Sequence, residues 1–305
     1  LDADGGEVRI ADADKPPSFD LSTVDPAPTP EAPPEGFTPE ELNTHFGDAV
    51  WRVESDGCGF ESGGSAFAIT PNHLVTNEHV AVIDTRPQLV SRNGEVRTGS
   101  VVGMVEDPDL AIIAVEEPMD IWLDWVPASE LVEGQQIVAM GYPLPAADFT
   151  VTTLAIASFA REGEVRIGIR GDGRIDRGNS GGPSLTADGR VAGINTAVNI
   201  NPGGQGAGLF GGGLQVVPFI FTFDAVEPYL ADLVASDEVV EPNCARVDLA
   251  EARTYGDNPF LDSLWEECDA GNPWGCDTLY RRSRARTEYE AFGASCGNRI
   301  AGGGS

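Results

Sequence analysis

Ten short segments rich in β-branched and aliphatic residues recur along the middle of the chain, separated by glycine, proline, asparagine and aspartate. Segments of this length and spacing are typical of an antiparallel barrel or sandwich. No helical pattern of useful length interrupts them. The sequence therefore predicts an all-β body. The segments span residues 49–54, 65–70, 73–80, 95–105, 110–116, 135–142, 150–159, 164–170, 191–197 and 214–218.

The sequence before this body changes character at residue 38. Residues 1–37 are acidic and proline-rich, which predicts a disordered leader or tether. Thr38 then provides an N-cap, Pro39 suits the first helical position, and Glu41 completes a capping box. We therefore expect a short helix from residue 38 to about Phe46.

The sequence after the body predicts a helix and then a small separate module. Residues 219–237 have the pattern of a C-terminal helix packed on the body. Residues 238–300 form a cysteine-containing piece with at least one helical segment, whose core is small enough to need disulfides. Residues 301–305 are a glycine-rich tail or linker. The domain assignment is therefore 38–237 for the main domain and 238–300 for the module.

The five cysteines favour disulfides over a metal site. They stand at positions 58, 244, 268, 276 and 296, and their spacing does not match the C-x2-C pattern of zinc ligands. Disulfides imply an oxidising compartment, and the odd number leaves one thiol free or paired with another chain. The pairing stays open, and Cys58 is either a packed thiol or half of a disulfide. No metal or cofactor is expected.

The net charge of −30 limits the possible partners. A strongly negative surface repels phosphate backbones and anionic membranes, so no nucleic-acid partner is expected. No uncharged stretch is apolar and long enough to span a membrane. Lys15 is the only lysine among 19 basic residues, which suggests a bacterial genome rich in GC. The absence of an export signal before Leu1 is what a mature exported form would show.

Three motifs occur in the order histidine, aspartate, serine. TNEHV contains His79, DPDLAII contains Asp109, and GNSGGP contains Ser180. With these motifs, residues 49–218 resemble the bacterial trypsin-like serine peptidases of the HtrA (Deg) type. The resemblance implies a chymotrypsin-like double β-barrel, to which the C-terminal helix and the disulfide-stabilised helical module are appended. No PDZ-like carboxylate-binding loop is recognised after residue 218.

The resemblance also implies a role for each residue. Ser180 would attack the peptide carbonyl, His79 would transfer the proton, and Asp109 would orient His79. Asp107 and Glu106 lie close by, but the position of Asp109 directly before LAII favours it. The other histidines, His45 and His73, are predicted to face solvent.

Further assignments concern the oxyanion and the substrate. The backbone N–H groups of Gly178 and Ser180 would form the oxyanion hole. Asn195, Thr196 and Ala197 would bind the substrate, whose backbone would add to the edge of this strand. Arg174 stands six positions before Ser180, where trypsin-like specificity would require an acid. Small or medium apolar P1 residues are therefore expected, by analogy with HtrA-type peptidases.

The sequence thus predicts a secreted or cell-envelope serine endopeptidase of bacterial origin, whose export signal has been removed. It would hydrolyse protein or peptide substrates through an acyl-enzyme, without a cofactor. The C-terminal module would have a protein partner. A non-catalytic protein-binding module on a peptidase scaffold is the alternative, in which the oxyanion loop or the cleft is closed.

Overall fold

The structure of the protein is a computed structural model, and it describes most of the chain between Glu35 and Ser295. Residues 1–34 of the predicted leader and Cys296 lie outside the described residues. The leader was predicted to extend to Phe37, but Phe37 is buried in the core and its N–H donates to the Ala187 carbonyl over 2.7 Å. The described ranges are 35–58, 60–143, 148–176, 178–199, 216–244, 254–255, 259–270, 276, 279–280, 283 and 287–295.

The first half of the body is a seven-stranded antiparallel sheet in the order β5-β4-β1-β2-β3-β7-β6. It curls around an apolar core that includes Val53, Leu74, Val101 and Ile113. The strands are β1 (Val50–Gly57), β2 (Phe60–Thr70), β3 (His73–Thr76), β4 (Gln88–Val90), β5 (Val96–Thr98), β6 (Ser100–Val105) and β7 (Leu110–Ala114).

The second half is a closed barrel in the order β10-β13-β12-β11-β8-β9. Its own core includes Ile137, Ile169, Ala192 and Ile220, which are all buried. The prediction of an all-β double barrel is therefore confirmed. The strands are β8 (Gln136–Gly141), β9 (Thr150–Glu162), β10 (Val165–Asp172), β11 (Pro183–Leu185), β12 (Val191–Asn199) and β13 (Val216–Phe221).

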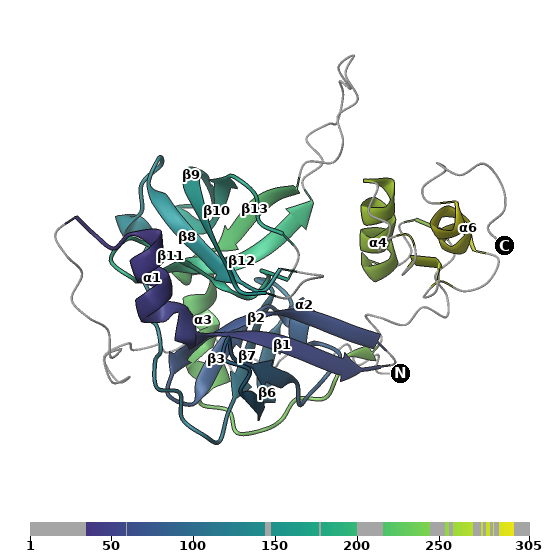
Figure 1. The fold of residues 1–305 in the computed structure, drawn as a ribbon, viewed down its shortest axis with the longest axis horizontal. Helices are drawn as coiled ribbons and strands as arrows, with labels where there is room; N and C mark the ends of the chain where they lie inside the picture. Colours follow the sequence, from purple (N-terminus) through teal and green to yellow (C-terminus); the bar gives the residue numbers. More distant parts are fainter. Residues whose placement is uncertain are drawn as a thin grey trace, which may run out of the picture.

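Two helices and a third apolar cluster join the two sheets, which lie one above the other in Figure 1. Helix α1 (Pro39–Phe46) begins with the predicted capping box between Thr38 and Glu41. Helix α3 (Phe223–Val234) packs into a cluster that takes residues from both sheets. At its centre the Trp125 ring lies 5.5 Å from the ring of Phe67 and 5.5 Å from that of Phe223.

Two expected elements differ from the structure. The strand-like run 73–80 ends at Thr76, and a one-turn helix, α2 (Glu78–Ala81), follows it. The helix expected over 219–237 spans only Phe223–Val234, because residues 219–221 belong to β13 and pair with β12. An isolated aromatic run is compatible with either structure, and the tertiary partner decides between them.

The C-terminal module has its own small core. Helices α4 (Pro259–Asp269) and α6 (Glu288–Ala294) pack Trp265 against Phe292, with ring centroids 3.6 Å apart. A disulfide between Cys268 and Cys276 lies in this core. The second disulfide joins Cys58 to Cys244 and so links the first sheet to the segment after α3. The expected disulfide-stabilised helical module is confirmed.

Candidate active site

His79 and Asp109 form a hydrogen-bonded pair. His79 Nδ1 lies 2.8 Å from Asp109 Oδ2, and the His79 backbone N–H donates to Oδ1 over 3.0 Å. Asp109 directly precedes β7 and adopts φ +55°, a left-handed conformation that aspartate tolerates better than most residues. Because one carboxylate bonds both the ring and the backbone of His79, it fixes the ring relative to α2. A proton on Nδ1 leaves Nε2 as the basic nitrogen.

Asn77 connects this pair to the second barrel. Its Nδ2 donates to the Asp109 carbonyl oxygen and to Thr196 Oγ1, at 2.9 Å in each case. The side chains of Asn77 and Thr196 are both buried. Thr196, predicted to bind substrate, therefore contacts the residue that supports the His79–Asp109 pair. Its role toward a substrate stays a prediction.

Ser180 lies in a tight turn that only glycine allows at the next position. The Gly182 N–H donates to the Asn179 carbonyl over 3.0 Å, so Ser180 and Gly181 are the central residues of a β-turn. Gly181 has φ +83°, which the third position of a type II turn requires. A Cβ there would lie 2.1 Å from the Ser65 carbonyl oxygen. The GNSGGP motif therefore places its serine by backbone geometry.

Asn195 on β12 supports this turn from the opposite side. Its carbonyl accepts from the Gly181 N–H over 2.9 Å, and its N–H donates to the Gly182 carbonyl over 2.8 Å. Its side chain is fully buried, accepts from Ser184 Oγ and donates to the Pro183 carbonyl. Asn195 was predicted to bind substrate, but its polar groups are directed to the Ser180 turn and to β11.

The remaining part of β12 has an edge on the side of the Ser180 turn. The pairing of β12 with β11 ends at Ile194, whereas its pairing with β13 continues through Ala197 to Asn199. Among the described strands, none pairs with residues 196–199 on this second side. The backbone of Ala197, the third predicted substrate-binding residue, therefore lies on a strand edge.

Ser65 is a residue that the sequence did not single out. It is fully buried on β2, and its Oγ donates to the Gly178 carbonyl over 2.7 Å and accepts from the Tyr142 N–H over 2.9 Å. Its backbone N–H donates to the Ser180 carbonyl over 2.8 Å. Its own carbonyl accepts from Thr76 Oγ1. The Oγ and the backbone N–H of Ser65 thus hold the segment around Ser180 against the first sheet.

Gly64 brings the His79 helix close to the Ser180 turn. A Cβ on Gly64 would lie 2.7 Å from a methyl group of Val80, the residue after His79, and 3.0 Å from the Ser180 carbonyl. The absence of a side chain at Gly64 lets β2 run between the two. All three predicted triad residues therefore lie around the same stretch of β2.

The amides assigned to the oxyanion hole are available. Within the described part of the chain, neither the Gly178 N–H nor the Ser180 N–H donates to a protein acceptor. Buried backbone donors without a partner are rare in proteins. Gly178 is buried, and Ser180 is only 6% exposed. Two such donors beside a serine are what an oxyanion hole requires.

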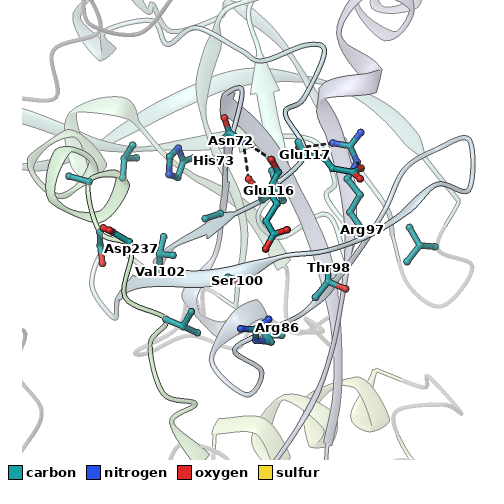
Figure 2. Close-up of a pocket in the computed structure, with 17 residues that line it drawn as sticks. Asn72, His73, Arg86, Arg97, Thr98, Ser100, Val102, Glu116, Glu117 and Asp237 are labelled. Atoms are coloured by element: carbon teal, nitrogen blue, oxygen red, sulfur yellow. Dashed lines mark hydrogen bonds and ion pairs between the residues drawn. The ribbon is translucent and has the colours of Figure 1, made fainter.

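A separate cavity of about 810 Å³ lies on the first sheet (Figure 2), bounded by His73, Arg97, Glu116 and Asp237. None of the predicted triad residues lines it. His73 was predicted to face solvent, but it is partly buried here and its Nδ1 lies 2.9 Å from Thr70 Oγ1. Burial lowers the pKa of His73 below its ordinary value.

Comparison with known proteins shows what this part of the chain is similar to. Residues 64–194 match the family described as "Trypsin-like peptidase domain". Residues 64–194 are therefore similar to trypsin-like peptidase domains. The match begins at Gly64 and therefore includes all three predicted triad residues, although the comparison itself assigns no role to them.

Named relatives support this placement of the peptidase domain. A probable periplasmic serine endoprotease, DegP-like, from Chlamydia pneumoniae is 31% identical over 180 residues, covering 57% of this chain and 36% of the relative. The Rhizobium meliloti (strain 1021) protein of the same name is 28% identical over 69% of this chain and 42% of its own length. Protease Do-like 1, chloroplastic, from Arabidopsis thaliana is 32% identical over 56% of this chain and 38% of its own. The chain thus spans well under half of these relatives.

Solved structures agree on the fold. The HtrA-type protease AlgW with tripeptide superposes with a TM-score of 0.55 at 24% identity, covering 65% of this chain and 64% of that chain. The serine endoprotease from Yersinia pestis gives a TM-score of 0.53 at 20% identity, covering 65% and 66%. At these identities the likeness establishes the double-barrel fold of the peptidase domain.

Two further findings concern ligands and membranes. Over the described ranges, no group of three or more histidine, cysteine, aspartate or glutamate side chains is placed to hold a metal ion. None of the described helices has the length and apolar character needed to cross a bilayer.

Proposed function

We propose that the protein is a serine endopeptidase in which His79, Asp109 and Ser180 act as the catalytic triad. The observation that carries the proposal is the pairing of His79 Nδ1 with Asp109 Oδ2 at 2.8 Å. It lies near Ser180, where the N–H groups of Gly178 and Ser180 have no protein acceptor among the described residues. An unassisted serine hydroxyl is a poor nucleophile and needs such a base and such an orienting carboxylate.

The reaction would proceed in two steps. Ser180 Oγ attacks the carbonyl carbon of the scissile peptide while His79 Nε2 takes the hydroxyl proton and then gives it to the leaving amine. The N–H groups of Gly178 and Ser180 stabilise the oxyanion, and losing one such donor typically costs about 10²–10³ in rate. Water then hydrolyses the acyl-enzyme by the same proton path. Asp109 stays ionised and stabilises the imidazolium of His79.

Protein or peptide segments are the proposed substrates. A segment in extended conformation can pair with the edge of β12 at residues 196–199, which places its scissile bond next to Ser180. The backbone of Thr196 and Ala197 would provide this edge. Small or medium apolar P1 side chains remain the proposal. Arg174 occupies the position where trypsin-like specificity would require an acid, and its side chain is 83% exposed and paired with Asp176.

The domain boundaries and the location are also proposals. Residues 38–237 would form the catalytic unit, 238–300 a module with a protein partner, and 1–37 a tether. The two disulfides and the periplasmic names of two relatives support an extracytoplasmic location after export.

A fluorophosphonate tests the triad directly. Such a reagent labels a serine only when a base activates it and an oxyanion hole is open. We expect a single adduct on Ser180 by intact mass, no adduct for Ser180→Ala, and strongly slowed labelling for His79→Ala. Absence of labelling of the folded wild-type protein at neutral pH would contradict the proposal and favour a non-catalytic binding module.

A further inference from the structure

The helix that carries His79 is too short to hold its own position. Helix α2 contains four residues, whereas isolated helices below about 12–15 residues are marginal in water. Its N-cap Asn77 makes no capping bond, because its side chain contacts Asp109 and Thr196 instead. The last carbonyl groups of any helix also need partners outside it. The position of His79 therefore depends on what the neighbouring segments provide.

Two segments far away in the sequence provide these partners. The Val80 carbonyl accepts from Ser55 Oγ on β1 over 3.0 Å. The carbonyl of Val82, the C-cap of α2, accepts from the Asn243 N–H over 2.8 Å. Residues 80–83 are all at most 4% exposed. The C-terminal end of α2 is thus closed by β1 on one side and by the segment around Asn243 on the other.

That segment, residues 235–244, will be called the strap. It starts at the C-cap of α3, whose residue Leu233 packs where Gly103 leaves space on β6. The Val240 N–H donates to the Val101 carbonyl over 2.9 Å, so the strap follows the edge of β6. It then reaches Val82 through Asn243. The strap ends at Cys244, in the disulfide with Cys58.

Cys58 lies where β1, the end of α2 and the strap meet. It directly follows β1, and its neighbour Gly57 is in such close contact that a Cβ would lie 1.8 Å from the Ile83 carbonyl oxygen. The Asp56 N–H donates to the Asp84 side chain over 3.0 Å, which adds a second link to the loop after α2. The disulfide therefore fastens the strap at the point where it contacts the helix of His79.

We infer that the Cys58–Cys244 disulfide is a positioning element for His79, and that full peptidase activity requires it to be oxidised. This inference rests on the proposed catalytic role of His79. Neither sulfur takes part in the chemistry. The disulfide keeps the strap against Val82 and thereby keeps α2 in place. In an exported chain the base would be fully positioned only after the protein had reached an oxidising compartment.

A general gain in stability has to be separated from this local effect. A disulfide that closes a long loop stabilises a fold wherever it lies, because it restricts the unfolded chain. A positioning element additionally changes the residues beside it in the folded protein. Hydrogen exchange of residues 78–84 distinguishes the two, with residues 110–114 of β7 as an internal reference.

The experiment uses the full chain with Cys268→Ser, Cys276→Ser and Cys296→Ser, so that only Cys58 and Cys244 remain. A dithiol reductant gives two electrons and two protons to this disulfide, leaves two thiols, and becomes a disulfide itself. We expect kcat on a peptide substrate to fall by about 10-fold to 100-fold, as for a misplaced catalytic group, with KM nearly unchanged. Exchange should rise in residues 78–84 and not in 110–114, and reoxidation should restore both.

The matched control also carries Cys58→Ser and Cys244→Ser, and its kcat should be low and insensitive to the reductant. Three results would overturn the inference. Hydrogen exchange in residues 78–84 could stay unchanged after reduction, it could rise equally in residues 110–114, or it could rise in residues 78–84 while kcat keeps its full value. The proposed function fails separately. If the oxidised protein shows no fluorophosphonate adduct but exchange in residues 78–84 still rises on reduction, the positioning stands and the catalytic role does not.

Discussion

Ser65 illustrates how one buried hydroxyl can set the geometry of a reaction that it does not enter. It bonds the Gly178 carbonyl, and its own N–H bonds the Ser180 carbonyl. The N–H groups of Gly178 and Ser180 are the proposed oxyanion donors. The Gly178 and Ser180 carbonyls belong to the peptide units that follow each donor residue, so the two bonds fix the backbone on the C-terminal side of both donors. Ser65 is therefore a positioning residue rather than a catalytic one.

Ser65→Ala should lower kcat by about 10-fold to 100-fold and leave KM nearly unchanged. The variant removes the hydroxyl that bonds the Gly178 carbonyl and the Tyr142 N–H, and each lost partner costs about 1–3 kcal/mol. Steady-state kinetics with a peptide substrate measures the separation of kcat from KM. Affinity for a peptide aldehyde, which forms the tetrahedral adduct, should fall in parallel with kcat.

Thr70→Ala is the matched control for Ser65→Ala. Thr70 also lies on β2, is 7% exposed, and bonds His73 and the Asn72 N–H through its hydroxyl. It does not contact the Ser180 turn. If Thr70→Ala lowered kcat as much as Ser65→Ala did, the effect would come from general weakening of β2, and the positioning role would be wrong.

Helix α1 depends on a local signal, and its stability can be tested through that signal. The Thr38 hydroxyl accepts from the Glu41 N–H, and the Glu41 carboxylate accepts from the Thr38 N–H at 2.8 Å. Thr38→Ala should destabilise the domain by about 0.5–2 kcal/mol, or a few degrees in Tm. Thr44→Ala in the same helix should have a much smaller effect, since Thr44 is exposed and caps no helix end.

The effect of Thr38→Ala should also depend on pH. Hydrogen bonds from the Thr38 backbone and hydroxyl lower the pKa of Glu41 below its ordinary value. The lowered pKa in the folded state means that this contribution is complete above the ordinary value and is lost as the pH falls through the lowered one. Thermal melts should show the difference between wild type and Thr38→Ala shrinking on acidification. A constant difference would argue against the carboxylate contribution.

The comparison of α1 and α2 shows what sequence patterns can and cannot predict. The start of α1 was predicted at its observed residue because the capping signal lies within four residues. Helix α2 was missed because it is closed by Ser55 and Asn243, which no local pattern connects to it. Local motifs likewise indicated His79, Asp109 and Ser180 as candidates. No local pattern connects Ser65 to them. Its partner Gly178 lies 113 residues away.

The charge of the whole molecule should make its stability depend on salt. With a net charge of −30, the compact state is destabilised by repulsion between its acidic groups. The Debye length falls from about 10 Å at 0.1 M to about 3 Å at 1 M, which screens this repulsion. We expect the melting temperature of the peptidase domain to rise over this range, by about 2–4 °C for each kcal/mol of repulsion removed.

The anion dependence identifies the cause of this stabilisation. Screening depends on ionic strength, so sodium chloride and sodium perchlorate should give similar gains up to a few tenths molar. Calorimetric melts in the two salts provide the measurement. A rise seen with sulfate but absent with both of these salts would indicate preferential exclusion from the surface instead of screening.

The Cys58–Cys244 disulfide joins positions 186 residues apart, and His79, Asp109 and Ser180 all lie between them. Residues 58–244 therefore form a covalent ring, and α1, β1 and the C-terminal module are attached outside it. A single hydrolytic cut of the backbone inside the ring, such as autoproteolysis by the proposed peptidase would make, adds one water molecule but releases no fragment. The cut ends stay in one molecule, so a cut between residues 58 and 244 becomes visible as separate pieces only after the disulfide is reduced.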